Sequence, residues 1–595
     1  MIDRFHAFQQ KVKNVVRALT KEQRRTYLVS LLFMVLNSML EVLTLGMLVP
    51  FIGVAVSPAA LQHYAANHPF LQPLLTISTP RLIIVIGVFI ISMFAVKNAV
   101  SYLMFAFENR FVYAIATGLS SRKVSEYYSS EFEDFQKSST AEMIREITYI
   151  PGDFAQHIIL GSLTILSEGM ILFLFIVAVA LYRPGVFGMT AATVLPFALL
   201  AWYLSSRLLK TTRSTIQKTS PANLNRLSDA LLGYQEIRLY QRQQFFIDRY
   251  LAGQRSLNLQ LGKLNTAIVI PGRLSELFAV AGIIVILFVN YQSEGQLTAS
   301  TLALLTIYVA FAYRAIPSVN KILNAVVHMQ TYAFTIDLLP AMEQVIHATG
   351  SPAEEDESPA LEFSRLIELQ NISYSYPGRK NPILNNASFR IRKGEVVGLV
   401  GRSGLGKTTF LRILLQLQRQ SSGEVLIDGT PLGEDNILSW HRLFSYVHQD
   451  SVILSDTIEA NITFGTPKRE DESVRLRCAI EKSGLTEFVS QLPSGLATHV
   501  GEQGRQLSGG QKQRLMIARA LYRDASVFIF DEATSQLDFE SEQAVIETIS
   551  SLHRNGKTIV IVSQGGQILR QCTKIYSLNR GKLLIRRKSP TTREL

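Results

Sequence analysis

The stretch Gly401-Arg-Ser-Gly-Leu-Gly-Lys-Thr408 decides the fold of the second half of this chain. It follows the apolar run Val396–Val400 and precedes a helix-forming run over 410–417. Glycines at this spacing let backbone N–H groups approach phosphate oxygens, and the start of the following helix adds positive potential. The pattern therefore predicts a strand, a phosphate-binding loop and a helix. The residues that we expect to hold the phosphates of a nucleotide are Gly401, Ser403, Gly404, Gly406, Lys407, Thr408 and Thr409.

Two consecutive carboxylates follow a second apolar run, Val527–Phe530. We expect Asp531 to hold Mg²⁺ together with the Thr408 hydroxyl, and Glu532 to polarise the attacking water as a general base. Acidic pairs after strands are also common as helix caps, so this pair alone would not indicate catalysis. It does so in combination with the phosphate loop upstream. Together the two motifs predict a protein that binds and hydrolyses ATP with Mg²⁺.

The composition predicts at least two domains. The chain has 595 residues, of which 48% are hydrophobic and 18% charged, and the long uncharged runs lie within residues 1–320. An acidic, proline-containing stretch over 348–360 is typical of a linker. We therefore predict a multidomain membrane protein, with a transmembrane domain over 1–347 and an α/β P-loop nucleotide-binding domain over 361–595.

Six apolar runs are long enough to cross a bilayer, which takes about 20 residues of helix. They cover 27–56, 82–107, 158–182, 186–204, 267–290 and 297–316. This pattern predicts a six-helix, all-α transmembrane domain. The polar, helix-prone stretches after the second and fourth runs predict long cytoplasmic helix extensions, whose tips near 133–135 and 233–236 dock on the nucleotide-binding domain. The alternative is that these stretches are mobile hydrophilic loops.

The net charge of +12 is placed asymmetrically along the chain. Lys and Arg are frequent in residues 1–25, whereas the candidate outer loops 57–80 and 291–300 contain neither. This is the positive-inside pattern, so we expect the N-terminus and the nucleotide-binding domain in the cytoplasm. Six spans argue against a soluble ATPase that handles nucleic acid, and no nucleic acid partner is expected. Both cysteines lie in the nucleotide-binding domain, which predicts no disulfide framework, and no cleaved signal peptide is predicted.

Further motifs around the phosphate loop carry a family resemblance. They are Tyr374-Ser-Tyr-Pro-Gly378, Gln449 and Leu507-Ser-Gly-Gly-Gln511. With them, residues 372–583 resemble the nucleotide-binding domain of an ABC transporter, and the whole chain resembles an ABC exporter half-transporter. The resemblance implies that Tyr376 stacks on adenine and that Gln449 senses the γ phosphate and Mg²⁺. It also implies that Ser508, Gly509, Gly510 and Gln511 close over the γ phosphate held by a second subunit, so a homodimer is expected.

The chain departs from the family pattern at two positions. After the apolar run Thr558–Val562 the family has a histidine that contacts the γ phosphate, whereas this chain has Gln564. Glutamine can donate a hydrogen bond but cannot become a cation, so we predict slow hydrolysis, whether the residue is natural or engineered. Gln536 stands where the family usually has alanine, and we expect little consequence.

Cations interrupt the predicted spans. Lys97, Arg273 and Arg314 each lie about 24–26 Å from the outer ends of their runs, at about 1.5 Å per helical residue. Lys321 continues the Arg314 face two turns later. An intramembrane charge costs about 2.5–3.5 kcal/mol on insertion scales and is usually functional or paired. We predict that these four residues bind an anionic headgroup whose apolar tail stays in lipid. The alternative is that they snorkel to the interface or pair with Glu276, Glu41 or Glu168.

Segments of the first and sixth spans sharpen the substrate hypothesis. The segments 39–52 and 313–321 resemble bacterial flippases that turn over lipid-linked oligosaccharides for protein glycosylation. The resemblance implies a polyprenyl-diphosphate glycan moved from the inner to the outer leaflet of a bacterial inner membrane. The rival cargoes are a peptide, a drug or lipid A. A rival of another class is a nucleotide-switched membrane regulator that transports nothing.

Overall fold

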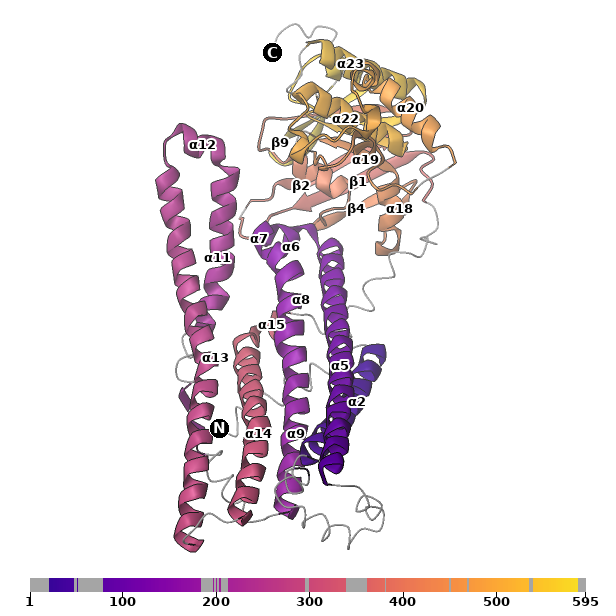
Figure 1. The fold of residues 1–595 in the computed structure, drawn as a ribbon. Helices are drawn as coiled ribbons and strands as arrows, with labels where there is room; N and C mark the ends of the chain where they lie inside the picture. Colours follow the sequence, from indigo (N-terminus) through magenta and orange to yellow (C-terminus); the bar gives the residue numbers. More distant parts are fainter. Residues whose placement is uncertain are drawn as a thin grey trace. The chain divides into compact units, whose positions relative to one another are not determined.

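The computed structural model describes residues 21–47, 51, 79–182, 196, 199–200, 203–204, 212–294, 299–338, 361–379, 381–448, 451–467, 470–533 and 539–586. The chain divides into two compact units (Figure 1). The first comprises Met1–Ser130 and Asp134–Pro352. The second comprises Ala353–Leu595 together with the short segment Glu131–Glu133. The predicted linker 348–360 lies outside the described residues.

Long helices make up the first unit. They are α2 (Lys21–Gly46), α5 (Thr79–Ser129), α9 (Leu160–Tyr182), α11 (Thr212–Leu232), α13 (Gln243–Glu294) and α14 (Ala299–Thr331). Shorter helical pieces are α7 (Thr140–Ile144), η2 (Arg145–Tyr149), α8 (Ile150–Asp153), η3 (Phe154–Ile159), α12 (Tyr234–Leu239) and α15 (Phe334–Leu338). The helix α6 (Phe132–Lys137) begins in the second unit and continues in the first from Asp134. The helices α5 and α13 are 51 and 52 residues long. At about 1.5 Å per residue each exceeds twice the thickness of a hydrocarbon core, so the helices continue beyond the predicted spans and the loop alternative is wrong. That these extensions are cytoplasmic stays a prediction.

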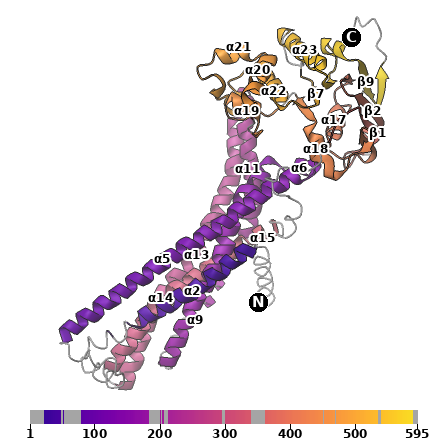
Figure 2. The same cartoon turned by 90° about the vertical axis from the view of Figure 1, so that its right-hand side faces the viewer.

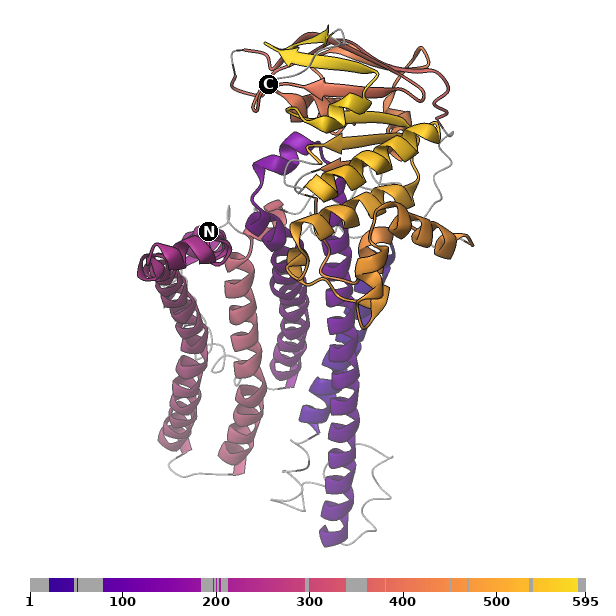
Figure 3. The ribbon, with the colours of Figure 1, turned by 90° about the horizontal axis from the view of Figure 1, so that it is seen from above.

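Apolar contacts hold these helices together. α2 packs on α5 and α9, α9 packs on α14, and α13 packs on α11 and α14. Figures 1 and 3 show α11 and α13 side by side, with α12 joining their ends. One buried cluster contains Met34, Val112, Phe154 and Leu163, each exposed by 5% or less. Other apolar side chains point outward, among them Ile91 at 71% and Leu181 at 81% exposed, as expected of helices that face lipid.

Four described helices are long and apolar enough to cross a membrane. They are Glu22–Gly46, Pro80–Ser129, Thr140–Ala178 and Gln243–Val289, and they overlap the predicted first, second, third and fifth spans. The predicted fourth span, 186–204, lies almost wholly outside the described residues. The sixth, 297–316, falls mostly in α14, which is not among these four. The helical membrane region is therefore confirmed, while the number of six spans stays a prediction.

Two sheets form the frame of the second unit. An antiparallel sheet has the order β2-β1-β4-β5, and a second sheet has the order β10-β9-β3-β8-β7-β6. The bounds of the antiparallel strands are β1 (Leu366–Tyr374), β2 (Leu384–Arg392), β4 (Ser422–Ile427) and β5 (Thr430–Pro431). Those of the second sheet are β3 (Val396–Val400), β6 (Phe444–His448), β7 (Val527–Asp531), β8 (Thr558–Val562), β9 (Lys574–Asn579) and β10 (Lys582–Arg586). β3 and β8 are buried along their whole length, as their continuous apolar runs predict for parallel strands covered on both faces.

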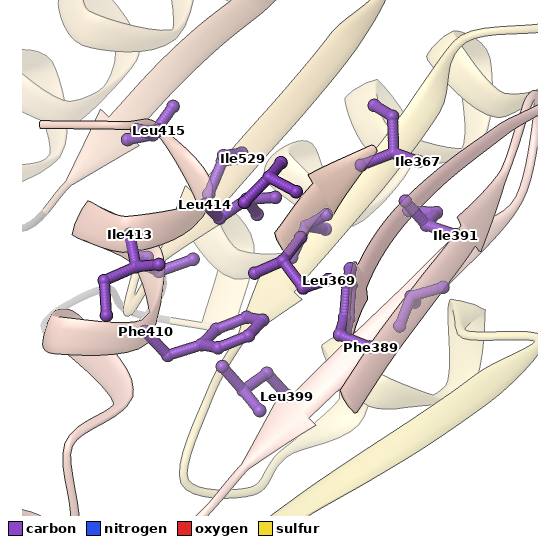
Figure 4. Packing of buried hydrophobic residues seen from close by; sticks show 14 of the residues in the cluster. Ile367, Leu369, Phe389, Ile391, Leu399, Phe410, Ile413, Leu414, Leu415 and Ile529 are labelled. Atoms are coloured by element: carbon purple, nitrogen blue, oxygen red, sulfur yellow. The ribbon is translucent and has the colours of Figure 1, made fainter. Parts of the chain in front are cut away.

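Helices cover this second sheet. They are α17 (Lys407–Leu414), α18 (Ile437–Arg442), α19 (Ile458–Thr463), α20 (Glu472–Lys482), α21 (Thr486–Ser490), α22 (Gly509–Arg523) and α23 (Phe539–Arg554). Figure 2 shows α19, α20, α21 and α22 gathered on one side of the unit. α17 is anchored between the sheets by Phe410, whose ring centroid lies 5.2 Å from that of Phe389 (Figure 4). This packing fixes the loop that precedes α17.

Candidate functional site

The loop between β3 and α17 requires glycine. Gly404 and Gly406 have φ of +78° and +101°, in the left-handed region that glycine enters without steric cost. A Cβ on Gly406 would lie 2.4 Å from Ile383 Cγ2. The loop curls around Lys407, whose Nζ donates to the carbonyl oxygen of Gly401 at 2.9 Å. The predicted strand, loop and helix are therefore present in the predicted order.

The loop forms one wall of a cavity of about 810 Å³. This volume lies in the range of pockets that hold small ligands, about 300–1,000 Å³. The predicted site residues that line it are Tyr376, Ser403, Gly404, Gly406, Lys407, Thr408, Thr409, Asp531 and Glu532. Sequence reasoning missed other lining residues, among them Phe132, Arg379, Arg412, Tyr446 and His448. They come from segments that carry no motif, so spacing alone gave no signal for them.

Asp531 ends β7 and faces the neighbouring strand β6. The Tyr446 hydroxyl donates to Asp531 Oδ2 at 3.0 Å. Burial raises the pKa of the Asp531 carboxyl above its ordinary value, and the nearby Glu532 raises it further, whereas the Tyr446 hydrogen bond lowers it. Lys407 also lowers this pKa, so a cation favours the ionised form of the carboxyl.

Glu532 occupies the turn that follows β7. Its φ is +51°, an uncommon backbone conformation for a residue with a side chain, and its N–H donates to the Val562 carbonyl at 2.9 Å. Glu532 Oε1 lies 3.6 Å from Lys407 Nζ. The Gln564 amide nitrogen donates to the same oxygen at 3.2 Å. The turn therefore places the candidate general base beside the phosphate-loop lysine, with Gln564 in contact with it.

We predict that Gln564→His raises ATP turnover about tenfold, because an imidazolium donates a stronger hydrogen bond to a charged phosphate than an amide does. Phosphate release at saturating MgATP measures the change. Gln543→His is the matched control, since Gln543 lies on α23 and bonds to Gln567 outside the cavity lining. An unchanged rate in Gln564→His would remove residue 564 from hydrolysis.

The oxygen donors at this end of the cavity fit Mg²⁺. Thr408 presents an exposed hydroxyl and Asp531 a carboxylate, the hard ligands that Mg²⁺ prefers. Within the described part of the chain, no group of three or more His, Cys, Asp or Glu side chains could hold a metal by itself. In the usual Mg²⁺ site of nucleotide enzymes, one or two protein ligands are joined by phosphate oxygens. The predicted third ligand, Gln449, lies outside the described residues, as does Gln536.

The Leu507–Gln511 motif starts helix α22 away from this cavity. Ser508 caps the helix by accepting from the Gln511 N–H at 3.3 Å, and Gln511 Oε1 accepts from the Ser508 N–H at 2.9 Å. Ser508 and Gly509 are exposed, and neither they nor Gly510 and Gln511 line the cavity. Within one copy, the structure therefore does not bring this motif to the phosphate loop.

Three of the four predicted substrate-binding cations belong to one ion network in the first unit. Arg314 Nε lies 2.9 Å from Glu41 Oε1, and its Nη2 lies 3.0 Å from Glu168 Oε2. Lys97 Nζ lies 3.4 Å from Glu41 Oε1, and Lys321 Nζ lies 2.6 Å from Glu168 Oε1. Four helices, α2, α5, α9 and α14, meet in this network. In the structure these three cations therefore pair with Glu41 and Glu168, as the alternative interpretation predicted.

Arg273 is separate from the ion network. Its Nη1 lies 3.4 Å from Glu276 Oε2 on the same helix, and both side chains are exposed. Within the described residues, no contact joins Arg273 to the network. It lines a mainly apolar cavity of about 710 Å³ with Lys263, Val269, Ile270 and other residues.

Known proteins are similar to this chain in sequence and in fold. Residues 384–535 match the family model described as ABC transporter. An ATP-dependent lipid A-core flippase of Xanthomonas campestris pv. campestris (strain 8004) is 28% identical over 504 residues, which are 84% of this chain and 83% of that protein. The protein of the same name from Dechloromonas aromatica (strain RCB) is 31% identical over 392 residues, 65% of each chain. The solved structure of a bacterial Atm1-family ABC exporter with ATP bound covers 94% of both chains at 22% identity, and its TM-score of 0.73 shows the same fold.

Proposed function

We propose that this chain, which has the characteristics of an ABC half-transporter of the exporter type that couples ATP hydrolysis to transport, flips a phosphorylated glycolipid of the lipid A-core class. The observation that carries this proposal is the similarity, over 84% of the chain, to relatives named for that cargo. The polyprenyl-diphosphate oligosaccharide inferred from the spans is the second candidate. Both cargoes combine phosphate groups, sugars and apolar chains, so both suit cations at the level of a lipid headgroup. We place the protein in a bacterial inner membrane.

The charges of the first unit support an anionic cargo. The ion network has three cations and two carboxylates, so it carries one net positive charge. Lys321 is its exposed member, with 57% of its side chain accessible, and Arg273 is 74% accessible. We therefore assign direct contact with an anionic headgroup to Lys321 and Arg273. All four cations pair with carboxylates, but the side chains of Lys97 and Arg314 are only 13% and 10% exposed, so we assign them no direct contact with the headgroup.

The nucleotide site supports a homodimer. One copy has a cavity lined by the phosphate loop, while its own Ser508–Gln511 helix start is exposed elsewhere. We propose that this helix start closes the cavity of a second copy, where its backbone N–H groups meet the γ phosphate. The exposed apolar residues around α12 support such a partner. They include Leu232 at 79%, Leu239 at 76% and Tyr240 at 69% exposed.

The proposed hydrolysis divides the work among the residues of the cavity. Tyr376 stacks on adenine, Lys407 neutralises phosphate charge, and Glu532 accepts a proton from the attacking water. Thr408 and Asp531 would hold Mg²⁺, which would supply positive charge beside the phosphates. The Lys407–Glu532 contact at 3.6 Å supports this division, because it places proton acceptor and phosphate ligand side by side.

We predict that the purified protein, reconstituted in proteoliposomes, moves lipid A-core across the bilayer when ATP and Mg²⁺ are added. Accessibility of labelled lipid to a membrane-impermeant reagent measures movement, and phosphate release measures hydrolysis. The arms contain lipid A-core, a polyprenyl-diphosphate oligosaccharide or a neutral lipid, and Lys321→Gln is expected to weaken stimulation by the anionic cargo severalfold. Movement of the oligosaccharide alone would select the second candidate. Hydrolysis without movement of any lipid would favour a nucleotide-switched regulator.

A further inference from the structure

Three consecutive side chains of the segment Glu131–Glu133 contact the nucleotide-binding unit to which the segment belongs. Glu131 Oε1 lies 3.7 Å from Arg419 Nε. The Phe132 ring centroid lies 4.8 Å from the guanidinium carbon of Arg412. The segment begins two residues after α5, a helix of 51 residues, ends at Ser129.

The third side chain, Glu133, binds two buried groups. Its Oε1 accepts from the Gln418 amide at 2.9 Å and from the Tyr374 hydroxyl. Gln418 and Tyr374 are only 4% and 3% exposed, so this carboxylate enters the body of the unit. Charge-assisted hydrogen bonds of this kind are stronger than those between neutral groups. The segment is therefore anchored at Glu133, next to the Phe132 contact.

Arg412 joins this segment to the predicted adenine residue. Arg412 lies on α17 and lines the nucleotide cavity together with Phe132 and Tyr376. Its guanidinium lies over the Phe132 ring, and its Nη1 donates to the Tyr376 hydroxyl at 3.4 Å. The Tyr376 hydroxyl also lies 3.1 Å from Thr409 Oγ1. The aromatic ring that is expected to stack on adenine is thus fixed by its hydroxyl end.

A second contact leads from the same segment to the same ring. Tyr374, which donates to Glu133, meets Tyr376 edge to face, with centroids 5.1 Å apart and an interplanar angle of 87°. Edge-to-face aromatic pairs are attractive and set ring orientation. Tyr376 is therefore held from two sides by groups that also hold residues 132 and 133.

We propose that Arg412 is a positioning residue for the nucleotide base. Arg412 contacts both Phe132 and the Tyr376 hydroxyl. It thereby holds the Tyr376 ring in the position that stacks on adenine and links that ring to the Glu131–Glu133 segment. Base binding and the position of the segment are then coupled, and the coupling is reciprocal. Arginine is required because its planar guanidinium can stack on a ring and donate in its plane at once, which a lysine ammonium cannot do. The inference rests on the proposed assignment of Tyr376 to adenine.

A double-mutant cycle in the full-length protein tests this coupling. The two changes are Phe132→Leu and Tyr376→Phe, which are conservative and remove one contact each on opposite sides of Arg412. Equilibrium binding of the fluorescent nucleotide mant-ADP is the readout, because it needs no hydrolysis. We expect each single variant to weaken mant-ADP binding about threefold to tenfold. The double variant should bind no more weakly than the single variant with the lower affinity. In an Arg412→Ala background, neither change should weaken binding again.

Controls separate this inference from the proposed function. Arg419→Ala should leave mant-ADP affinity unchanged, since Arg419 contacts Glu131 but does not line the cavity. Arg412→Lys should behave like Arg412→Ala. Additive effects of Phe132→Leu and Tyr376→Phe, or coupling that survives in Arg412→Ala, would overturn the inference while nucleotide binding stands. Full binding in Tyr376→Ala would overturn both the adenine assignment and the inference. Failure of the unaltered protein to bind mant-ADP would instead overturn the nucleotide site.

Discussion

Glu532→Gln is expected to lower ATP turnover by roughly a thousandfold while nucleotide still binds, because removal of a general base costs about 10²–10⁴-fold in rate. The carboxylate lies 3.6 Å from Lys407 Nζ, at the phosphate end of the cavity. An amide has nearly the same shape but cannot accept the proton of the attacking water. Phosphate release under saturating MgATP measures the rate, and mant-ADP binding shows that the cavity persists.

The matched control is Glu547→Gln, an exposed carboxylate of α23 outside the cavity lining. It should retain full turnover. If Glu532→Gln hydrolysed ATP within threefold of the unaltered rate, another group would have to serve as the base. Loss of mant-ADP binding in the same variant would instead indicate that the turn after β7 had collapsed.

Glu168→Ala is expected to destabilise the protein by about 3–5 kcal/mol, since removing one partner of a buried ion pair leaves the other charge uncompensated. Glu168 is 6% exposed and holds both Arg314 at 3.0 Å and Lys321 at 2.6 Å. It also accepts from the Ser318 hydroxyl at 2.7 Å. Thermal unfolding in a fixed detergent should show the melting temperature falling by on the order of 10 °C.

Glu276→Ala is the control for this experiment, because its pair with Arg273 is exposed and such pairs contribute about 0–1 kcal/mol. Combining Glu168→Met with Arg314→Met should restore part of the lost stability, since apolar residues of similar size often replace a buried pair without cost. Equal melting temperatures for Glu168→Ala and Glu276→Ala would contradict the importance of the network. Arg314→Ala would also remove a member of the buried network, so a loss of transport in that variant could come from lower stability or from weaker cargo binding. Lys321→Gln is therefore the better test of cargo binding.

Local sequence patterns predicted the strand, loop and helix around Lys407 and the place of Asp531 and Glu532 after β7, because these depend on neighbouring residues. The phosphate loop takes its conformation from its own glycines and its place from the apolar run before it. Asp531 and Glu532 follow a strand directly, so their place at the end of the sheet required only that the strand exist. Tyr446, Arg412 and Phe132 could not be predicted in this way, since strand pairing and chain packing bring them to the cavity from unrelated segments.

The charged residues of the predicted spans show what sequence patterns could not predict. Counting residues along each helix predicted that Lys97 and Arg314 share a level, and both contact Glu41 in the structure. It could not predict that Arg273 stands apart, because spacing along a helix does not say which helices pack together or which face each one turns inward. Tertiary packing decides which carboxylate each cation pairs with. The sequence therefore left open whether the cations pair with carboxylates such as Glu41 and Glu168 or bind an anionic headgroup.

The unbroken helix α5 has a mechanical consequence. Over its 51 residues from Thr79 to Ser129 the hydrogen-bonded ladder contains no intervening loop that could absorb a displacement. Only two residues separate Ser129 from Phe132, so a displacement of the chain at Ser129 meets no loop within α5 that could absorb it. The stiffness of α5 comes from its backbone hydrogen bonds and not from any particular side chain. It therefore sets how much of a movement near Ser129 reaches the other end of the helix at Thr79.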